Sequence, residues 1–249
     1  MLLGRISANQ AEEALAFYAQ NAGGLLLYPR TVVELCDHLE KKMVLASIRD
    51  TDGLVALGWI SHFSDFVYLT IEDEHLQIHN DGPYTGTGGW CIHSKYRGSG
   101  VLKQLAGLIL REWDTFESSA TLRGLWARMA GIKDADGNPL FWNRVGAEVT
   151  GVPYAALLEN PFGTMERTIW KKWPREPIPL SRLPQAVITE TRGRAFPPLR
   201  KPFELFLQWG IIEETHRYVP TSLNAFHVTI SEHLPNLKRF MADALEQAV

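Results

Sequence analysis

The sequence predicts an α/β fold, in which a mixed, mainly antiparallel sheet is flanked by helices and followed by a C-terminal strand–helix–strand extension. Three observations predict it. Short runs rich in β-branched and aliphatic residues, such as residues 43–48 and 54–63, are separated by polar turns, which is typical of strands. Between such runs, apolar residues recur at offsets of three and four, most clearly across residues 102–116, which is the period of a helix. Both patterns return between residues 185 and 245.

Local signals define the elements of the first 129 residues. Asp50-Thr51-Asp52-Gly53 separates two apolar runs and predicts a hairpin turn, and Glu72-Asp73-Glu74 separates residues 66–71 from residues 75–80 as a second strand pair. The other expected elements are strands at residues 1–6, 89–92 and 121–129, and helices at residues 11–18, 32–39 and 102–116.

The elements after residue 137 have weaker signals. Residues 137–149 predict a short helix followed by a strand, because Asn138 suits the N-cap, Pro139 the first helical position and Gly146 the C-terminal stop. The remaining expected elements are strands at residues 185–193 and 211–219, a helix at residues 201–210 that ends on Gly210, and a last helix capped by Ser231.

Two parts of the chain are expected, residues 1–150 as a core and residues 151–249 as an α/β extension packed on it. The prolines between residues 174 and 184 predict an extended crossover, since proline fixes φ and stiffens the chain. Residues 185–230 carry a large apolar surface, so we expect them to pack beside the sheet of the core and to help form an acceptor pocket.

The composition favours a cytoplasmic globular protein. The chain has 249 residues, of which 45% are hydrophobic and 21% charged, with a net charge of −3, so nothing points to nucleic acid or an anionic membrane as a partner. Two cysteines cannot build a disulfide framework or a four-thiolate metal site, and we predict no metal. No signal peptide or membrane-spanning run is recognised. A homodimer is left open.

A glycine turn, Arg97-Gly98-Ser99-Gly100-Val101-Leu102, lies between a strand and a long helix. The first amides of a helix lack partners within it, so such a turn can bind a phosphate. It is not a Walker A loop, because no Gly-Lys-Ser/Thr follows, and it is not a dinucleotide fingerprint, because Lys103 stands where the last glycine belongs. An ordinary glycine-rich turn is the alternative.

The hexamer resembles the R/Q-x-x-G-x-G/A loop of the GCN5-related N-acetyltransferases (GNAT), which binds the pyrophosphate of an acyl-coenzyme A. The short aromatic helix at residues 137–149 resembles the second landmark of that superfamily, and the order of elements agrees with it. The resemblance implies a GNAT fold with acetyl-CoA or succinyl-CoA as co-substrate. It also implies a set of cofactor-binding residues: Cys91, Ile92, His93, Arg97, Gly98, Ser99, Gly100, Val101, Asn138, Phe141 and Trp142.

Within the superfamily, the sequence is similar to the arginine N-succinyltransferase family. The similarity rests on Asn80-Asp81, Thr85-Gly86 and Tyr96-Arg97, on residues 134–142, and on Pro177-Ile178-Pro179. It implies an N-acyltransferase that moves an acetyl or succinyl group to the amine of a small molecule, such as the amino acid arginine, by direct attack within a ternary complex.

The catalytic candidates are His79 and Asp81, which occupy the region that faces the acceptor in relatives. A histidine has an ordinary pKa near 6.5 and can accept a proton from an ammonium at neutral pH, and His93 is a weaker candidate. Trp142 stands where many relatives have the tyrosine that protonates the leaving thiolate, so Tyr154 or water would take that role. The alternative function is a non-catalytic GNAT-fold acyl-CoA sensor or protein-binding module.

Overall fold

The computed structural model describes residues 1–21, 31–41, 43–115, 124–161, 163–230 and 234–246. Its ten described strands form one sheet, in the order β1-β2-β3-β6-β7-β10-β9-β4-β5-β8. Among the described strands, all neighbouring pairs are antiparallel except β6 with β7, which run parallel. The strands are β1 Leu2–Arg5, β2 Met43–Asp50, β3 Gly53–Phe63, β4 Val67–Glu72, β5 His75–Asn80, β6 Tyr84–Ile92, β7 Gly124–Arg128, β8 Ile178–Pro179, β9 Glu213–Tyr218 and β10 Ala225–Ile230. The predicted mixed, mainly antiparallel fold class is confirmed.

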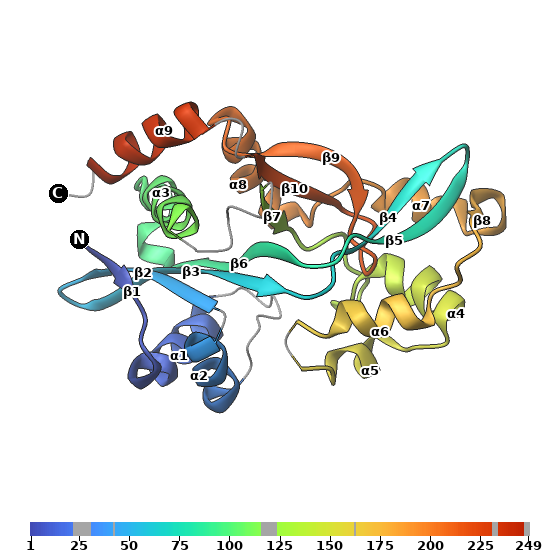
Figure 1. Ribbon diagram of the computed structural model, residues 1–249, viewed down its shortest axis with the longest axis horizontal. Helices are drawn as coiled ribbons and strands as arrows, with labels where there is room; N and C mark the ends of the chain where they lie inside the picture. Colours follow the sequence, from blue (N-terminus) through green and yellow to red (C-terminus); the bar gives the residue numbers. More distant parts are fainter. Residues whose placement is uncertain (22–30, 42, 116–123, 162, 231–233, 247–249) are drawn as a thin grey trace.

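Helices cover both faces of the sheet (Figure 1). The helix α3 (Val101–Asp114) lies with α9 on one face, above a cluster that includes Ile48, Ile60 and Leu105. The helix α1 (Ala11–Asn21) lies with α2 on the opposite face, over a cluster with Leu45, Leu57 and Trp59. The remaining helices are α2 Val32–Lys41, α4 Ala147–Thr150, α5 Tyr154–Leu158, α6 Met165–Lys172, α7 Gln185–Thr191, α8 Pro197–Gln208 and α9 Leu234–Glu246.

The strands β3, β4, β5 and β6 form a long bent ribbon. The chain leaves along β3, continues as β4, turns back at Asp73-Glu74 and returns along β5 and β6. At the bend, the Phe66 amide donates to the Gly82 carbonyl at 2.6 Å and the Asp81 amide donates to the Phe66 carbonyl at 3.2 Å. Pairing therefore continues through the bend, which directs β4 and β5 away from β3 and β6 (Figure 1).

The C-terminal region contributes strands to the sheet. The strand β10 pairs with β7, β9 pairs with β10, and Leu69 of β4 is in register with Tyr218 of β9. Residues 185–230 were expected to pack beside the sheet; β9 and β10 instead lie within it, between β7 and β4. The division into residues 1–150 and 151–249 stays a prediction.

The short aromatic helix is longer than its sequence indicated. It runs from residue 140 to residue 150 and contains a π-helical segment, Trp142–Gly146, so the strand predicted after Gly146 is wrong. Gly146 has an ordinary helical φ of −60°, and a Cβ there would overlap the Trp142 indole. The helix stops at Gly151, whose φ of +69° is the left-handed conformation that glycine adopts at helix ends. Glycine at 146 serves packing and glycine at 151 serves termination.

The strand predicted at residues 185–193 is also wrong, because Gln185–Thr191 is the helix α7. Its β-branched residues suggested a strand, yet Ile188 and Thr191 are spaced three apart and both are buried. Residues 185–230 thus form two helices, α7 and α8, followed by two strands. The strand β9 was predicted from the sequence and β10 was missed. The helix α8 begins four residues before the predicted start, and Gly210 follows its end at a φ of +67°. Ser231 lies outside the described residues.

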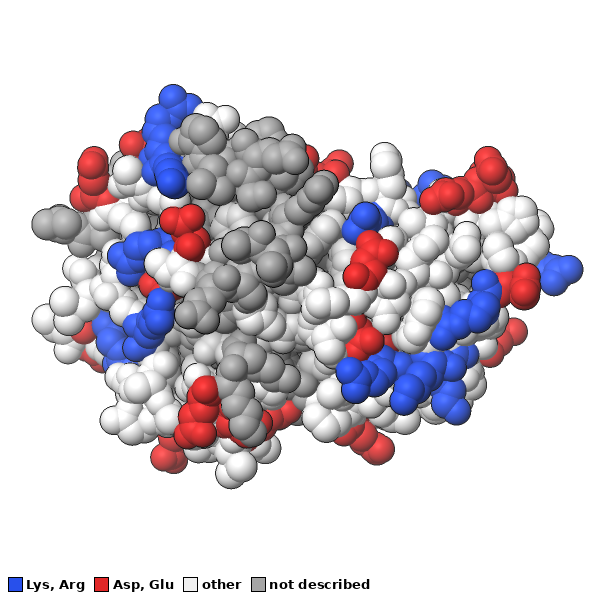
Figure 2. Space-filling view, in the orientation of Figure 1, with Lys and Arg blue, Asp and Glu red and all other residues white. Residues whose placement is uncertain are grey.

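Charges of both signs are interspersed over much of the visible face, with basic side chains gathered where α6 lies (Figure 2). That helix carries Arg167, Lys171 and Lys172. Among the described helices, none is long and apolar enough to cross a membrane.

Candidate active site

The glycine turn is anchored to the hairpin between β2 and β3. The His93 amide donates to the Val55 carbonyl at 2.9 Å, and the Tyr96 hydroxyl donates to the Asp50 carboxylate. That hydrogen bond, together with others from the backbone, lowers the pKa of the Asp50 carboxyl. The imidazole of His93 accepts the Lys95 amide at 3.2 Å, so His93 acts as a turn residue in this structure. The turn is therefore held in place before any ligand binds.

The turn offers backbone donors and open space. Gly98 and Gly100 have φ values of +84° and +86°, and a Cβ on either would meet no atom within 4 Å. Among the described residues, no acceptor is found for the amides of Gly98, Gly100, Val101 and Leu102, whereas Lys103 and Gln104 both donate to the Gly100 carbonyl. Leu102 packs into the cluster beneath α3, so its side chain does not crowd the turn. These features fit the phosphate of a coenzyme A.

Positive charge flanks the turn on one side. The Arg97 guanidinium reaches the carbonyl of Asn21 at the end of α1, at 3.4 Å. The Lys95 ammonium lies 3.7 Å from the Asp52 carboxylate, and both side chains are mostly exposed. Such an exposed pair is weak and leaves the ammonium available to an anion. Both cations could neutralise a bound phosphate.

Immediately before the turn, β6 separates from β7. Their parallel pairing covers Thr85, Gly86 and Thr87 of β6 and ends there, so the side of residues 88–92 that faced β7 has no strand partner among the described residues. A bulge interrupts the pairing with β3 at the same level, and Gly89 adopts a φ of +59°. A Cβ on Gly89 would lie 2.5 Å from the Trp59 indole, so only glycine allows this close approach. The edge of β6 that is not paired therefore runs from Gly88 towards the glycine turn.

The last two residues of β6, Cys91 and Ile92, point to opposite faces of the sheet. Cys91 is buried on the α1 face, and burial raises the pKa of its thiol to about 11, so it is not a thiolate at neutral pH. Ile92 packs against the α3 face. Neither side chain offers a reactive group, so any contact with a ligand would come from their backbone.

The second group of predicted cofactor residues lies in a different cluster. Phe141 and Trp142 are fully buried against β4 and β5, and the Trp142 indole donates to the Val152 carbonyl at 2.9 Å. The Asn138 amide donates to the Asp134 carboxylate at 2.9 Å, which makes Asn138 part of a turn and not the N-cap. Phe141 and Trp142 belong to a different cluster from Leu102 of the glycine turn, and the role of these residues and of Asn138 in binding stays a prediction.

His79 lies near the end of β5, and Asp81 directly follows that strand. The Nε2 atom of His79 lies 2.9 Å from the Thr70 hydroxyl, and its ring stacks on Tyr68 with centroids 5.1 Å apart. One oxygen of Asp81 accepts hydrogen bonds from the Tyr68 hydroxyl at 3.0 Å and from Arg217 at 3.1 Å. The two candidates thus share Tyr68 as a neighbour, and Asp81 is engaged in an ion pair.

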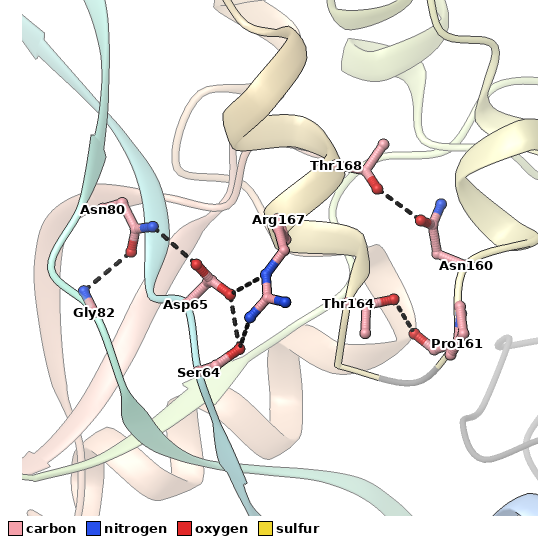
Figure 3. Close-up of polar contacts among 9 residues, drawn as sticks. All are labelled: Ser64, Asp65, Asn80, Gly82, Asn160, Pro161, Thr164, Arg167 and Thr168. Atoms are coloured by element: carbon pink, nitrogen blue, oxygen red, sulfur yellow. Dashed lines mark hydrogen bonds and ion pairs between the residues drawn. The ribbon is translucent and has the colours of Figure 1, made fainter.

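A polar network fastens α6 to the bend of the ribbon, beside these two residues (Figure 3). Arg167 donates to Asp65 at 3.1 Å and to Ser64 at 2.9 Å, and Asn80 donates to the other oxygen of Asp65 at 3.1 Å. Burial alone would raise the pKa of the Asp65 carboxyl, but these donors outweigh it and lower the pKa. The Asn80 side chain also accepts the Gly82 amide at 3.0 Å, so the network fixes both chains of the bend.

Sequence reasoning missed several polar residues on these strands. Arg128 of β7 forms a buried ion pair with Glu166 of α6. Burial disfavours the charged form of Arg128, yet the Glu166 carboxylate outweighs this and raises the pKa of the guanidinium. His62 of β3 lies 3.0 Å from the Thr85 hydroxyl, and burial lowers the pKa of its imidazole. Nothing local marks these residues, because each partner comes from a distant part of the sequence.

Comparisons with known proteins concern the fold. No family model matches the sequence, and no curated protein matches it. The structure of arginine/ornithine succinyltransferase subunit AI from Pseudomonas aeruginosa superposes with a TM-score of 0.64 at 13% identity, covering 95% of this chain and 78% of that one. The chain has the fold of that succinyltransferase. The GNAT resemblance predicted from the sequence is therefore confirmed at the level of the fold.

Smaller acetyltransferases match part of the chain. A predicted acetyltransferase from Clostridium acetobutylicum, solved with acetyl-CoA, gives a TM-score of 0.37 at 10% identity, covering 56% of this chain and 85% of that one. An aminoglycoside 6'-N-acetyltransferase from Acinetobacter haemolyticus gives 0.35 at 11% identity, covering 52% and 80%.

Proposed function

We propose that the protein is an N-acyltransferase that moves an acyl group from an acyl-CoA to the amine of a small molecule. The observation that carries this is the separation of β6 from β7 directly before a glycine turn whose amides have no acceptor among the described residues. A strand gap next to a phosphate-binding turn can accept the extended arm of coenzyme A and present its thioester to the opposite face. The GNAT fold supports the same reading.

The reaction would be direct attack of a neutral amine on the thioester carbonyl. The amine nitrogen forms a bond to the carbonyl carbon, the oxygen takes up the negative charge of a tetrahedral intermediate, and the carbon–sulfur bond then breaks to release the thiolate. Backbone amides of residues 88–92, on the side of β6 that is not paired with β7, would stabilise that oxygen. His79 is the candidate base that takes the proton of the ammonium, and Asp81 is the second candidate.

The finer substrate assignment also belongs to this proposal. The acyl group is acetyl or succinyl, and the acceptor is an amino acid such as arginine, because the sequence and the fold both resemble an arginine succinyltransferase. The rival function is a non-catalytic acyl-CoA sensor. It is favoured by Trp142, whose buried indole leaves the usual thiolate donor position without a hydroxyl.

One experiment with two variants tests the function. Gly100→Val should abolish coenzyme A binding in isothermal titration, because the side chain would occupy the space before the amides and would strain a φ of +86°. Gly210→Val is the matched control, since Gly210 also has an open surrounding and a φ of +67° but lies at the end of α8. His79→Asn should keep coenzyme A affinity and lower turnover by roughly 10²- to 10⁴-fold.

Turnover is read as release of free thiol from acetyl-CoA and succinyl-CoA with a panel of amines. Equal coenzyme A affinity in the Gly100 variant and the wild type would refute the assignment of the glycine turn as the coenzyme A site. Binding without thiol release for any amine would replace the enzyme by the sensor. Full turnover in the His79 variant would transfer the role of base to Asp81 or water.

A further inference from the structure

Arg217 of β9 is held in an aromatic cage. Its guanidinium carbon lies 4.6 Å from the centre of the Tyr68 ring, 5.2 Å from Trp126 and 5.5 Å from Phe66. These rings come from β4, β7 and the bend of the ribbon, and the centres of all three lie within 5.5 Å of the guanidinium carbon. Aromatic faces attract a guanidinium and restrict its rotamers, so the cage fixes the plane of the Arg217 head group.

The ion pair of Arg217 uses only a small part of its hydrogen-bonding capacity. One terminal nitrogen donates to one oxygen of Asp81 at 3.1 Å, and the other side-chain nitrogens of Arg217 have no acceptor among the described residues. The side chains are 37% and 48% exposed, so the pair itself adds little stability. A guanidinium has five N–H donors in a fixed fork that matches a carboxylate. Most of that fork is unused here.

Trp126, one ring of the cage, lies on β7 where that strand pairs with β6. Trp126 is in register with Gly86, three residues before Gly89 at the bulge. At about 3.3 Å per residue, this places the Trp126 position about 10 Å along the strand from the bulge. The cage therefore lies near the point where the edge of β6 becomes unpaired.

The charge of the cage bears on which group it can recognise. An aromatic cage with a carboxylate would suit a cationic substrate, but Arg217 already occupies that place and pairs with Asp81. The group presented outward is a preorganised cation with free donors. We propose that Arg217 binds a carboxylate of the substrates and so determines specificity for a carboxylate-bearing acyl donor or acceptor. The proposal rests on the acyltransferase function proposed above.

Two sources of that carboxylate are distinguished by two arms of one experiment. In the donor arm, succinyl-CoA and acetyl-CoA are titrated into the wild type, Arg217→Gln and Arg217→Lys. In the acceptor arm, KM and kcat are measured with acetyl-CoA for an amino acid and for its carboxamide. Arg192→Gln is the control, because Arg192 also contacts a tyrosine, Tyr218, but does not touch the cage.

The carboxylate-bearing compound of one arm should lose roughly 10- to 100-fold in Kd or KM in Arg217→Gln, while the compound without the carboxylate changes less than twofold. Arg217→Lys keeps the charge but not the fork, so it should recover only part of the loss. Loss in the donor arm identifies the acyl carboxylate, and loss in the acceptor arm identifies the carboxylate of the amine.

The proposal is overturned if the wild type does not prefer the carboxylate in either arm, or if both Arg217 variants keep the wild-type preference. Circular dichroism and urea unfolding check that the variants are folded. If Arg217→Gln fails to fold, the lysine variant alone decides the result. Failure of the acyltransferase function is seen separately, since the wild type would then release no thiol with any amine.

Discussion

Removing Arg128 from its ion pair with Glu166 should lower the stability of the protein strongly. The Glu166 side chain is 4% exposed and the Arg128 side chain 32% exposed, so replacing Arg128 by Met leaves a buried carboxylate without its cation. Removing one partner of a buried pair typically costs about 3–5 kcal/mol. Because Arg128 is partly exposed, we expect the lower end, about 3 kcal/mol, which for this chain length lowers Tm by roughly 6–12 °C.

Urea unfolding at constant m-value measures this cost. The double variant Arg128→Met with Glu166→Leu should recover most of the lost stability, since an apolar pair of similar size can replace a buried ion pair. Arg5→Met is the matched control. Glu112 is also nearly buried, but it retains Arg111 at 3.3 Å when Arg5 is removed, so the cost should stay below about 1 kcal/mol. A cost below 1 kcal/mol for Arg128→Met, or no recovery in the double variant, would refute the reasoning.

Two further outcomes follow from buried polar groups. Burial lowers the pKa of the His62 imidazole in the folded state, so the unfolded chain binds more protons as pH falls from about 6.5. The contribution of His62 to stability should be full above that pH and should decline just below it. In urea midpoints measured from pH 7 to 5, the His62→Gln variant should not show this decline. The Tyr18 hydroxyl is buried and has no hydrogen-bond partner among the described residues. Tyr18→Phe should therefore leave stability unchanged or raise it by about 1 kcal/mol, and a loss of stability in urea would contradict this.

Local chemistry made part of the fold predictable. The hairpin turns at Asp50-Gly53 and Glu72-Glu74 and the glycine turn before α3 lie where the sequence placed them. Each depends on residues close in the chain, such as a glycine that adopts a positive φ. The sequence could also predict the GNAT fold, because its two landmarks occur in the expected order.

The failures involve residues whose environment comes from elsewhere. Gly146 was interpreted as a helix stop, but its role depends on the Trp142 ring packing against it. Residues 185–191 have strand propensity, yet Ile188 becomes buried through a helical face. The position of β10 between β7 and β9 requires pairing across roughly a hundred residues of chain, which no local pattern encodes.

The candidate site shows the same distinction. The glycine turn is contiguous in sequence and was recognised, whereas the Arg217 cage is assembled from β4, β7, β9 and the bend of the ribbon. Asp81 was selected as a possible base, but its partner Arg217 could not be identified without the pairing of β9. A residue's chemistry can be read from its type, while its partners depend on topology.

The strands β9 and β10 complete the sheet, and β9 also carries Arg217 into its cage. The strand β10 continues the sheet from β7, and β9 then meets β4 at Leu69 and Tyr218, so the two strands bridge the parallel pair and the bent ribbon. Arg217 precedes Tyr218, and its guanidinium faces rings carried by both sides of that bridge. Because side chains alternate between the faces of a strand, a shift of β9 by one residue would move Arg217 to the opposite face and empty the cage. The strand register that completes the sheet is therefore the same register that places Arg217 in the cage, and a core without β9 would keep the glycine turn but lack Arg217.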